Sequence, residues 1–345
     1  MKAVVVNRLA RPELSDIPLL IDSELPDPEF KPHDLLVRVE AVAVNPIDLK
    51  MTRAKQAPQS PERVVGWDVA GTVVGMGADV SGFQLGDVVF YAGSVLRPGA
   101  CSALHAVDAR LVGRKPATLS FVQAAALPLS SLAAWEALFE RMRLPRGPLQ
   151  QPTTQPTTLL VIGGAGGVGS MAVQLASKLT EVRVIATASR PESQLFCRDM
   201  GAADVVDHSQ PLWPQLNALG VPLVDFVLCL TDPAPLMPQL ADILAPHAHV
   251  CSLVEASADL PMNLLRAKSI SFSWEGMFTR SMFRTPDMAR QGEILNEVSA
   301  LVDAGVLKTT LRVDLGNINA KNVLQAHQLI GSGRMIGKVA MGKFD

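Results

Sequence analysis

The stretch LLVIGGAGGVGS, residues 159–170, decides the fold of this chain. It carries the spacing G-x-G-x-x-G directly after an apolar run and before an amphipathic helical pattern, the context that a dinucleotide-binding turn requires. In such a turn the first glycine, here Gly164, makes the tight bend. The second lets backbone N–H groups approach a pyrophosphate, and the third lets the helix pack on the strand. The helix N-terminus adds free N–H donors and a positive dipole end. The predicted cofactor-binding residues of this turn are Gly164, Gly166, Gly167, Val168 and Gly169.

The segments that follow this turn continue to alternate between two patterns. Short apolar runs at 182–188, 224–230 and 249–254 read as strands, and residues 191–201 read as a helix that ends at Gly201. Strands that alternate with helices of this length predict βαβ units in a parallel sheet.

The chain on either side of this region has a different rhythm. Valine-rich runs at 1–6, 35–44 and 69–74, broken by glycine, proline and aspartate, predict a β-rich domain at the start of the chain. The C-terminal part is predicted to form a helix, a strand, a helix and a closing strand, at 286–304, 309–315, 319–330 and 337–341.

The amino-acid composition argues against several classes of protein. The chain has 345 residues, 48% of them hydrophobic and 19% charged, which is the balance of a globular protein with about two domains. With a net charge of -2 it has no basic surplus for phosphates, so we expect no nucleic-acid partner. Four cysteines without a C-x-x-C spacing argue against disulfides and zinc knuckles. We expect no signal peptide and no membrane span, and a reducing, cytoplasmic location.

The choice of cofactor is read after the second strand of the parallel sheet. An NAD site places Asp or Glu about 20 residues after the glycines, where it binds the ribose 2′-OH. Here the region 186–191 holds no carboxylate and the next one is Glu192, whereas Ser189 and Arg190 can bind a 2′-phosphate instead. This favours NADP(H). The alternative is a helix N-cap at Ser189 followed by a solvent-facing arginine.

Several motifs together resemble the medium-chain dehydrogenase/reductase superfamily, in its zinc-free quinone oxidoreductase branch, and proteins labelled zinc-type alcohol dehydrogenase-like. The resemblance covers nearly the whole chain. It implies an α/β fold with a GroES-like catalytic domain over 1–130 and 281–345, and an NADP(H)-binding, doubly wound Rossmann domain over 131–280. It also implies a homodimer or homotetramer. The motifs are VNPID (44–48), GWDVAG (66–71), GDVV (86–89), AAALP (124–128), AWEA (134–137), TASRP (187–191) and GK (337–338).

The resemblance also predicts that zinc is absent. The positions where zinc-dependent relatives hold their catalytic metal fall at Asn45, Trp67 and near Leu129, and none of these side chains is a zinc ligand. Without a Lewis acid, simple ketones are difficult substrates, whereas quinones and α,β-unsaturated carbonyls accept hydride readily. We therefore expect a small-molecule substrate of one of these two kinds.

Three residues are predicted to act on the substrate by this resemblance. Asn45 would donate its amide N–H to the developing oxyanion, and its alternative role is a turn residue before Pro46. Asp48 would orient the site or, alternatively, cap a helix. Trp67 would form a flat wall of the cleft or simply pack in the core, and Tyr91 is a weaker candidate for the same wall. The remaining cofactor contacts are predicted at Leu230, Thr231, Leu253, Val254 and Lys338.

The predicted function is that of an NADPH-dependent reductase of quinones or enones. An enoyl-thioester reductase is an alternative, although no basic cluster for a phosphopantetheine is evident along the sequence. A nonenzymatic NADPH-binding protein is the alternative from another class. Measuring NADPH oxidation with a panel of quinones and alkenals distinguishes these three functions.

Overall fold

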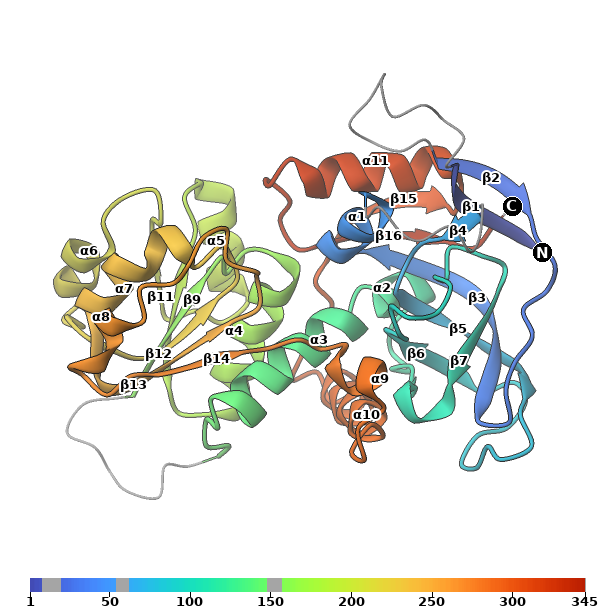
Figure 1. The fold of residues 1–345 in the computed structure, drawn as a ribbon, viewed down its shortest axis with the longest axis horizontal. Coiled ribbons are helices and arrows are strands. Elements are labelled where there is room, and N and C mark those ends of the chain that lie inside the picture. Colours follow the sequence, from blue (N-terminus) through green and yellow to red (C-terminus); the bar gives the residue numbers. More distant parts are fainter. Residues whose placement is uncertain (8–19, 54–61, 148–156, 345) are drawn as a thin grey trace. The chain divides into compact units, whose positions relative to one another are not determined.

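The computed structural model describes residues 1–7, 20–53, 62–147 and 157–344. The chain forms two compact units (Figure 1). Unit 1 comprises Met1–Leu129 and Phe278–Asp345, and unit 2 comprises Ser130–Met277. The boundaries expected from the sequence, 130/131 and 280/281, lie within three residues of these.

Unit 2 is built on a six-stranded sheet in which all neighbouring strands run parallel. The strand order is β11-β10-β9-β12-β13-β14. This is the doubly wound order 3-2-1-4-5-6 of a Rossmann fold, which confirms the predicted fold class. The strands are β9 (Thr158–Ile162), β10 (Arg183–Thr187), β11 (Asp204–Val206), β12 (Val224–Cys229), β13 (Leu244–Ser252) and β14 (Ser271–Trp274).

The first strand of unit 2, β9, is buried along its whole length. All five residues of β9 are buried, as expected when helices cover both faces of a parallel sheet. The longest of these helices, α4, buries the continuous stretch 169–176. The helices are α4 (Gly167–Leu179), α5 (Pro191–Asp199), α6 (Leu212–Ala218), α7 (Met237–Ile243) and α8 (Asn263–Arg266).

Unit 1 has a seven-stranded sheet in the order β15-β16-β3-β5-β6-β8, with β7 paired to β3, and a three-stranded sheet β2-β1-β4. Closing strand β16 pairs antiparallel with β3, so the C-terminal segment completes a sheet that the segment Met1–Leu129 begins. The strands are β1 (Lys2–Asn7), β2 (Leu20–Glu24), β3 (Asp34–Val44), β4 (Glu62–Val64), β5 (Asp68–Met76), β6 (Val88–Tyr91), β7 (Leu104–Asp108), β8 (Gly113–Arg114), β15 (Leu311–Asn317) and β16 (Lys338–Gly342). The helices are α1 (Pro46–Arg53), α2 (Phe121–Ala125), α9 (Thr279–Phe283), α10 (Arg290–Asp303) and α11 (Ala320–Gly331).

The apolar segment between the β-rich start and the Rossmann strands is an interrupted helix. It consists of α2, then α3 (Pro128–Trp135), then a π-helix over Glu136–Arg141. The break falls where Pro128 has no N–H to continue the hydrogen-bond ladder. By length and hydropathy the segment Phe121–Arg141 passes as a membrane span, contrary to expectation, but 83% of its most apolar window is buried. That burial is typical of a core helix.

The glycine turn between β9 and α4 differs in one respect from the prediction. The left-handed residue that makes the bend is Gly163, with φ +86°, and not Gly164. A side chain at Gly164 would instead meet the Ala186 Cβ atom at 2.7 Å, so that glycine permits close packing on β10. The third glycine has its predicted role, because a Cβ atom on Gly169 would lie 2.2 Å from the Gly163 carbonyl oxygen.

This crowding predicts the effect of two matched substitutions. Gly169→Ala should lower the free energy of unfolding of unit 2 by about 1–3 kcal/mol or more, because the backbone of the turn must move. Gly166→Ala should have a much smaller effect, since the nearest atom beyond its chain neighbours, the Gly163 carbonyl oxygen, would lie 3.6 Å from the new Cβ atom. Urea unfolding followed by tryptophan fluorescence measures both, because three of the four tryptophans lie in unit 2. Equal losses in the two variants would contradict the close-packing role of Gly169.

Candidate active site

A buried polar cluster in unit 1 joins three residues that are far apart in the sequence. Asn45 follows β3, Asp68 begins β5 and Lys338 begins β16. Strand β3 lies between the other two, with Ala43 paired to Asp68 and Val44 paired to Val339. The register of the sheet therefore brings the three polar side chains to one place.

The cluster is closed by short hydrogen bonds. The Lys338 ammonium lies 2.9 Å from Asp68 Oδ2, 2.5 Å from Asn45 Oδ1 and 3.0 Å from the Val44 carbonyl oxygen. The Asn45 amide nitrogen donates to Asp68 Oδ2 at 2.9 Å, and the Leu129 N–H donates to Asp68 Oδ1 at 2.8 Å. Burial raises the pKa of Asp68, and the lysine and the asparagine oppose that shift. The carboxylate is thus held by partners on both of its oxygens.

These contacts fix the orientation of the Asn45 amide. A lysine ammonium can only donate, so the amide oxygen must face Lys338 and the amide nitrogen must face Asp68. The nitrogen carries a second N–H, which has no partner within the described ranges. Asn45 is therefore a preorganised donor with one hydrogen available, as the oxyanion role requires.

Asp48 lies in the first turn of α1 and holds the residue that precedes the helix. Its Oδ2 atom accepts the Asn45 backbone N–H at 2.5 Å, and its own N–H donates to the Asn45 carbonyl oxygen at 3.0 Å. Asp48 is thus not the N-cap of the alternative reading. Its carboxylate instead accepts the N–H of Asn45, the residue before the helix, as the acidic partner in a capping box does. This contact fits the predicted orienting role.

The Asp48 carboxyl group is buried next to other ionisable groups. Burial raises its pKa to about 7; Asp68 adds to the shift, whereas the Asn45 hydrogen bond and Lys338 oppose it. Its Oδ1 atom has no hydrogen-bond partner among the residues that the structure describes. Burial therefore keeps this carboxyl protonated to a higher pH than in water.

The two aromatic candidates use their polar atoms inside unit 1. Trp67 is 1% exposed and donates its indole N–H to the Ser94 carbonyl oxygen at 3.0 Å. Tyr91 is fully buried, stacks on His105 and places its hydroxyl 3.0 Å from His105 Nδ1. Both environments are those of core residues. A contact of either ring with substrate stays a prediction.

In unit 2 the predicted cofactor residues gather at the carboxyl ends of the central strands. The Leu230 N–H donates to Ile162 of β9 at 3.2 Å, and the Leu253 N–H donates to Cys229 of β12 at 3.2 Å. The side chains of Leu230 and Thr231 lie against Gly163, which begins the glycine turn. The turn and the segments after β12 and β13 therefore share the switch-point edge of the sheet, where such folds bind dinucleotides.

The predicted 2′-phosphate residues lie at the start of α5. Arg190, which is half-buried, is the residue before the helix, and its N–H donates to Ser193 Oγ at 3.2 Å. Ser189 is exposed and precedes it. The N-cap is therefore Arg190, and the alternative that places Ser189 there is wrong. Contact of either residue with a 2′-phosphate stays a prediction.

Three functional contacts were not predicted from the sequence. The GWDVAG motif contains Asp68, but only the strand pairing reveals its two partners. The Thr187 hydroxyl accepts the Gly163 N–H at 3.1 Å and so braces the glycine turn. Lys338 was expected to face cofactor phosphates, yet its three N–H groups have three acceptors within unit 1. A direct bond to phosphate would have to replace one of these, and it stays a prediction.

The residues at the family's zinc positions do not fit a zinc ion. Asn45, Trp67 and Leu129 offer none of the imidazole, thiolate or carboxylate ligands that zinc needs. Over the described ranges, no three His, Cys, Asp or Glu side chains lie close enough together to hold a metal. All four cysteines are buried free thiols.

The raised pKa of Asp48 predicts a pH-dependent stability difference. In the unfolded chain this carboxyl loses its proton near pH 3.8, but in the folded protein near pH 7. Between these values the folded state binds more protons, so its stability falls as the pH rises. The amide in Asp48→Asn does not titrate, so the variant does not lose this stability as the pH rises. Its unfolding free energy minus that of the wild type should rise from pH 4 to pH 7, by on the order of 2–4 kcal/mol, and then level off. Urea denaturation at several pH values measures this, and a pH-independent difference would contradict it.

Comparison with known proteins gives consistent matches over the whole chain. Residues 31–128 match the family described as alcohol dehydrogenase GroES-like domain, and residues 200–341 match the family described as zinc-binding dehydrogenase. The chain is 35% identical over 341 residues to a zinc-type alcohol dehydrogenase-like protein of Staphylococcus aureus strain MSSA476, covering 99% of each protein. It is 34% identical over 200 residues to the 2-methylene-furan-3-one reductase of Solanum lycopersicum, covering 56% of this chain and 49% of that one.

Solved structures agree with these matches. A Rhizobium etli CFN 42 protein described as a zinc-dependent alcohol dehydrogenase is 46% identical, with a TM-score of 0.93 over 100% of this chain and 98% of that chain. A mycobacterial protein solved with NADPH is 25% identical, with a TM-score of 0.80 over 99% of both chains. The matched relatives, the GroES-like sheet and the 3-2-1-4-5-6 Rossmann sheet lead to one conclusion: the chain belongs to the medium-chain dehydrogenase/reductase superfamily of oxidoreductases.

Proposed function

We propose that this protein is a metal-independent, NADPH-dependent reductase of quinones or α,β-unsaturated carbonyls. The observation that carries the proposal is the Asn45 amide. It is locked by Lys338 and Asp68 at a position where zinc-dependent relatives place a metal ligand, and one of its N–H groups is left over. A neutral hydrogen-bond donor would then do at the substrate oxygen what the metal ion does in those relatives.

A neutral amide is a weak hydrogen-bond donor, and this supports conjugated carbonyl compounds as substrates. An amide N–H stabilises a developing negative charge less than a metal ion does, so the substrate itself must spread that charge. Quinones and enones do so by conjugation. The tomato relative is named for a ketone conjugated to an exocyclic C=C bond, which is a substrate of this kind.

The residues of unit 2 support a dinucleotide as the hydride source. The N-cap of α4 is Gly166, which has no side chain to accept the first N–H groups of the helix. Those N–H groups, from Gly167, Val168 and Gly169, would bind the pyrophosphate. Bound NADPH would supply the hydride, while the residues around Leu253 and Val254 would orient its carboxamide. The protein solved with NADPH supports the same choice.

The alternatives remain distinguishable by substrate. An enoyl-thioester reductase would prefer thioesters to free enones and quinones, and a nonenzymatic binding protein would bind NADPH without oxidising it. The homodimer or homotetramer predicted from the resemblance is part of the proposal and is measured separately, by sedimentation.

The proposed function predicts NADPH oxidation that does not depend on metal. Purified protein should oxidise NADPH with a quinone or an alkenal, should contain less than stoichiometric zinc, and should keep its rate in EDTA. The rate with a saturated ketone of the same size is the control and should be near zero, since such a ketone cannot spread the charge. One zinc per chain with activity lost in chelator would refute the metal-independent mechanism, and no oxidation of NADPH with any acceptor would refute the enzyme.

The cofactor preference predicts the effect of Arg190→Ala. Loss of a charge-assisted bond to the 2′-phosphate should weaken NADPH binding by roughly 1.5–3 kcal/mol, and NADH binding should change little. Arg198→Ala is the matched control, because it removes an exposed arginine from the last turn of the same helix. Titrations of both cofactors by fluorescence measure this. Equal weakening of NADH and NADPH would mean that Arg190 does not contact the 2′-phosphate.

The role of Asn45 predicts a change in kcat more than in KM. An oxyanion-hole donor can contribute on the order of 10²–10³ in rate, but a conjugated acceptor already spreads its charge, so Asn45→Ala should lower kcat by about tenfold. The loss should be largest for the poorest acceptors. NADPH affinity and melting temperature are the controls, since the same side chain holds Lys338 and Asp68. Normal kcat with weakened NADPH binding would make Asn45 a cofactor residue.

A further inference from the structure

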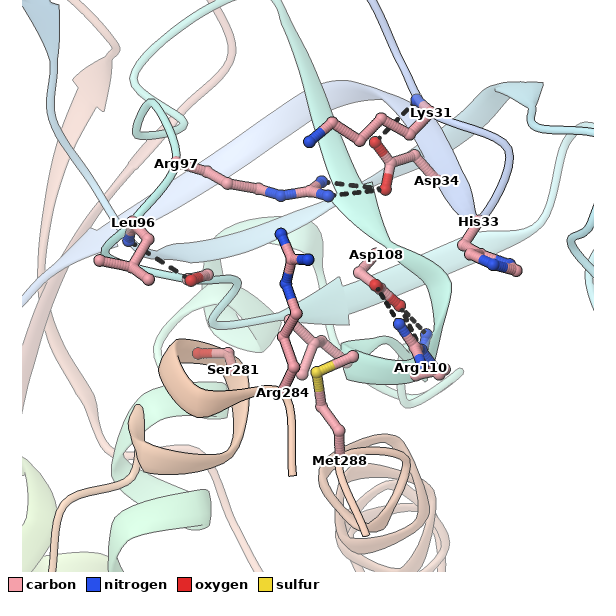
Figure 2. A pocket seen from close by; sticks show the side chains of 12 residues that line it. Lys31, His33, Asp34, Leu96, Arg97, Asp108, Arg110, Ser281, Arg284 and Met288 are labelled. Carbon is pink, nitrogen blue, oxygen red and sulfur yellow. Dashed lines mark hydrogen bonds and ion pairs between the residues drawn. The ribbon is translucent and has the colours of Figure 1, made fainter. Parts of the chain in front are cut away.

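A cavity in unit 1, separate from the Asn45 cluster, gathers cations from four segments of the chain. Its volume is about 250 Å³. Lys31 comes from the turn before β3, Arg97 from the loop after β6, Arg110 from the short 3-10 helix after β7, and Arg284 from the residue after α9. Figure 2 shows these side chains around one space. Neither Asn45 nor any other residue of the buried cluster lines it.

Two of the arginines are held in fixed positions by carboxylates. Arg97 donates from both terminal nitrogens to Asp34 Oδ1 at 3.0 Å, and Asp34 is 2% exposed. Arg110 binds Asp108 in two places, at 2.9 and 2.8 Å. A guanidinium has five N–H donors, so each arginine keeps donors for a further acceptor. Each pair is therefore neutral as a whole but still offers N–H groups to a ligand.

The other two cations have no such partners. Within the residues that the structure describes, neither the Arg284 guanidinium nor the Lys31 ammonium makes a hydrogen bond or ion pair. Figure 2 shows the Arg284 guanidinium projecting into the space between the Arg97–Asp34 and Asp108–Arg110 pairs. The cavity thus has four cations against two carboxylates, an excess of two positive charges.

The backbone of Arg284 has an uncommon conformation. Its φ is +48°, in the left-handed region that a residue other than glycine adopts only at a cost in energy. A glycine would end α9 with less strain. Arginine at this position instead adds a guanidinium to the lining of the cavity.

We propose that this cavity binds a small oxyanion, the carboxylate or phosphate group of a metabolite. The planar fork of Arg284 matches the geometry of such oxygens, Arg97 keeps further N–H donors although its fork binds Asp34, and Lys31 adds a point charge at the side. A volume of about 250 Å³ is below that of pockets for drug-sized ligands, so the group bound is small and a dinucleotide is excluded. Anion binding here does not depend on the reductase activity, because no residue that we predict to bind the cofactor or the substrate lines this cavity.

The test measures binding of inorganic phosphate and of acetate by calorimetry, at constant ionic strength set with chloride. The key variant is Arg284→Gly, which removes the guanidinium and relieves the left-handed strain, so it should fold and melt no lower than wild type. Arg97 is avoided because its loss would leave the buried Asp34 carboxylate without its partner. We expect wild type to bind one of the two probes, and Arg284→Gly to bind it about 10- to 100-fold more weakly. Lys31→Met should weaken it to a smaller extent.

Two controls separate this site from other sources of anion binding. Arg190→Ala removes the predicted 2′-phosphate residue in unit 2, and Arg266→Ala removes an exposed arginine of α8. Both should bind the probe as wild type does. Loss of binding in Arg190→Ala would assign the anion to the cofactor site, and equal weakening in Arg266→Ala would reveal a general charge effect. Either result, an unchanged affinity in Arg284→Gly, or no binding of either probe to wild type, would overturn the proposal. Preference for phosphate or for acetate identifies the group.

Discussion

A lysine ammonium and an aspartate carboxylate lie 2.9 Å apart in the core of unit 1, and both are almost wholly removed from water. Their residues, Lys338 and Asp68, are 270 positions apart in the sequence. Removing either charge from water is expensive, and only a well-bonded partner offsets that penalty. Here both charges are fully bonded, by each other, by Asn45, and by the backbone of residues 44 and 129.

This pair constrains the sheet as well as the site. Strand β16 must enter beside β3 at the register that brings Lys338 to Asn45, since a shift by one residue would turn the lysine to the opposite face. The desolvated ammonium then decides which way the Asn45 amide faces. One buried ion pair thus closes the C-terminal strand onto the sheet of unit 1 and aims the one hydrogen-bond donor on which the proposed chemistry depends.

The sequence is sufficient where a site is built from neighbouring residues. The glycine turn, its helix and the alternating strands are all local patterns, and from them the parallel sheet and the residues at its carboxyl edge could be predicted. The error at Gly163 and Gly164 is small and instructive. Adjacent glycines fit the same motif, and only the backbone angles show that the first makes the bend while the second packs against Ala186.

The sequence is insufficient where a site is built from distant side chains. Nothing near Asp68 indicates that Lys338 will neutralise it, and the polar atoms of Trp67 and Tyr91 find their partners only after the sheet has formed. The basic cavity is the clearest case. Its four cations come from separate stretches of the chain, so no local pattern indicates that they meet, yet the fold brings them to one space.

The two units therefore use different physical means to handle charge. Unit 2 offers backbone N–H groups on a helix end, whose positions follow from glycine spacing and tolerate change in most side chains. Unit 1 relies on side chains whose charges are stable only in each other's presence. A substitution at Gly169 disturbs packing in one turn, whereas a substitution at Asp68 leaves an ammonium buried without its counter-charge and an amide without its orientation. Asn45 stands at one of the metal positions of the family, and this lysine–aspartate pair supplies a fixed electrostatic frame for its amide. An amide held in that frame needs no metal ion to keep its N–H pointing in one direction.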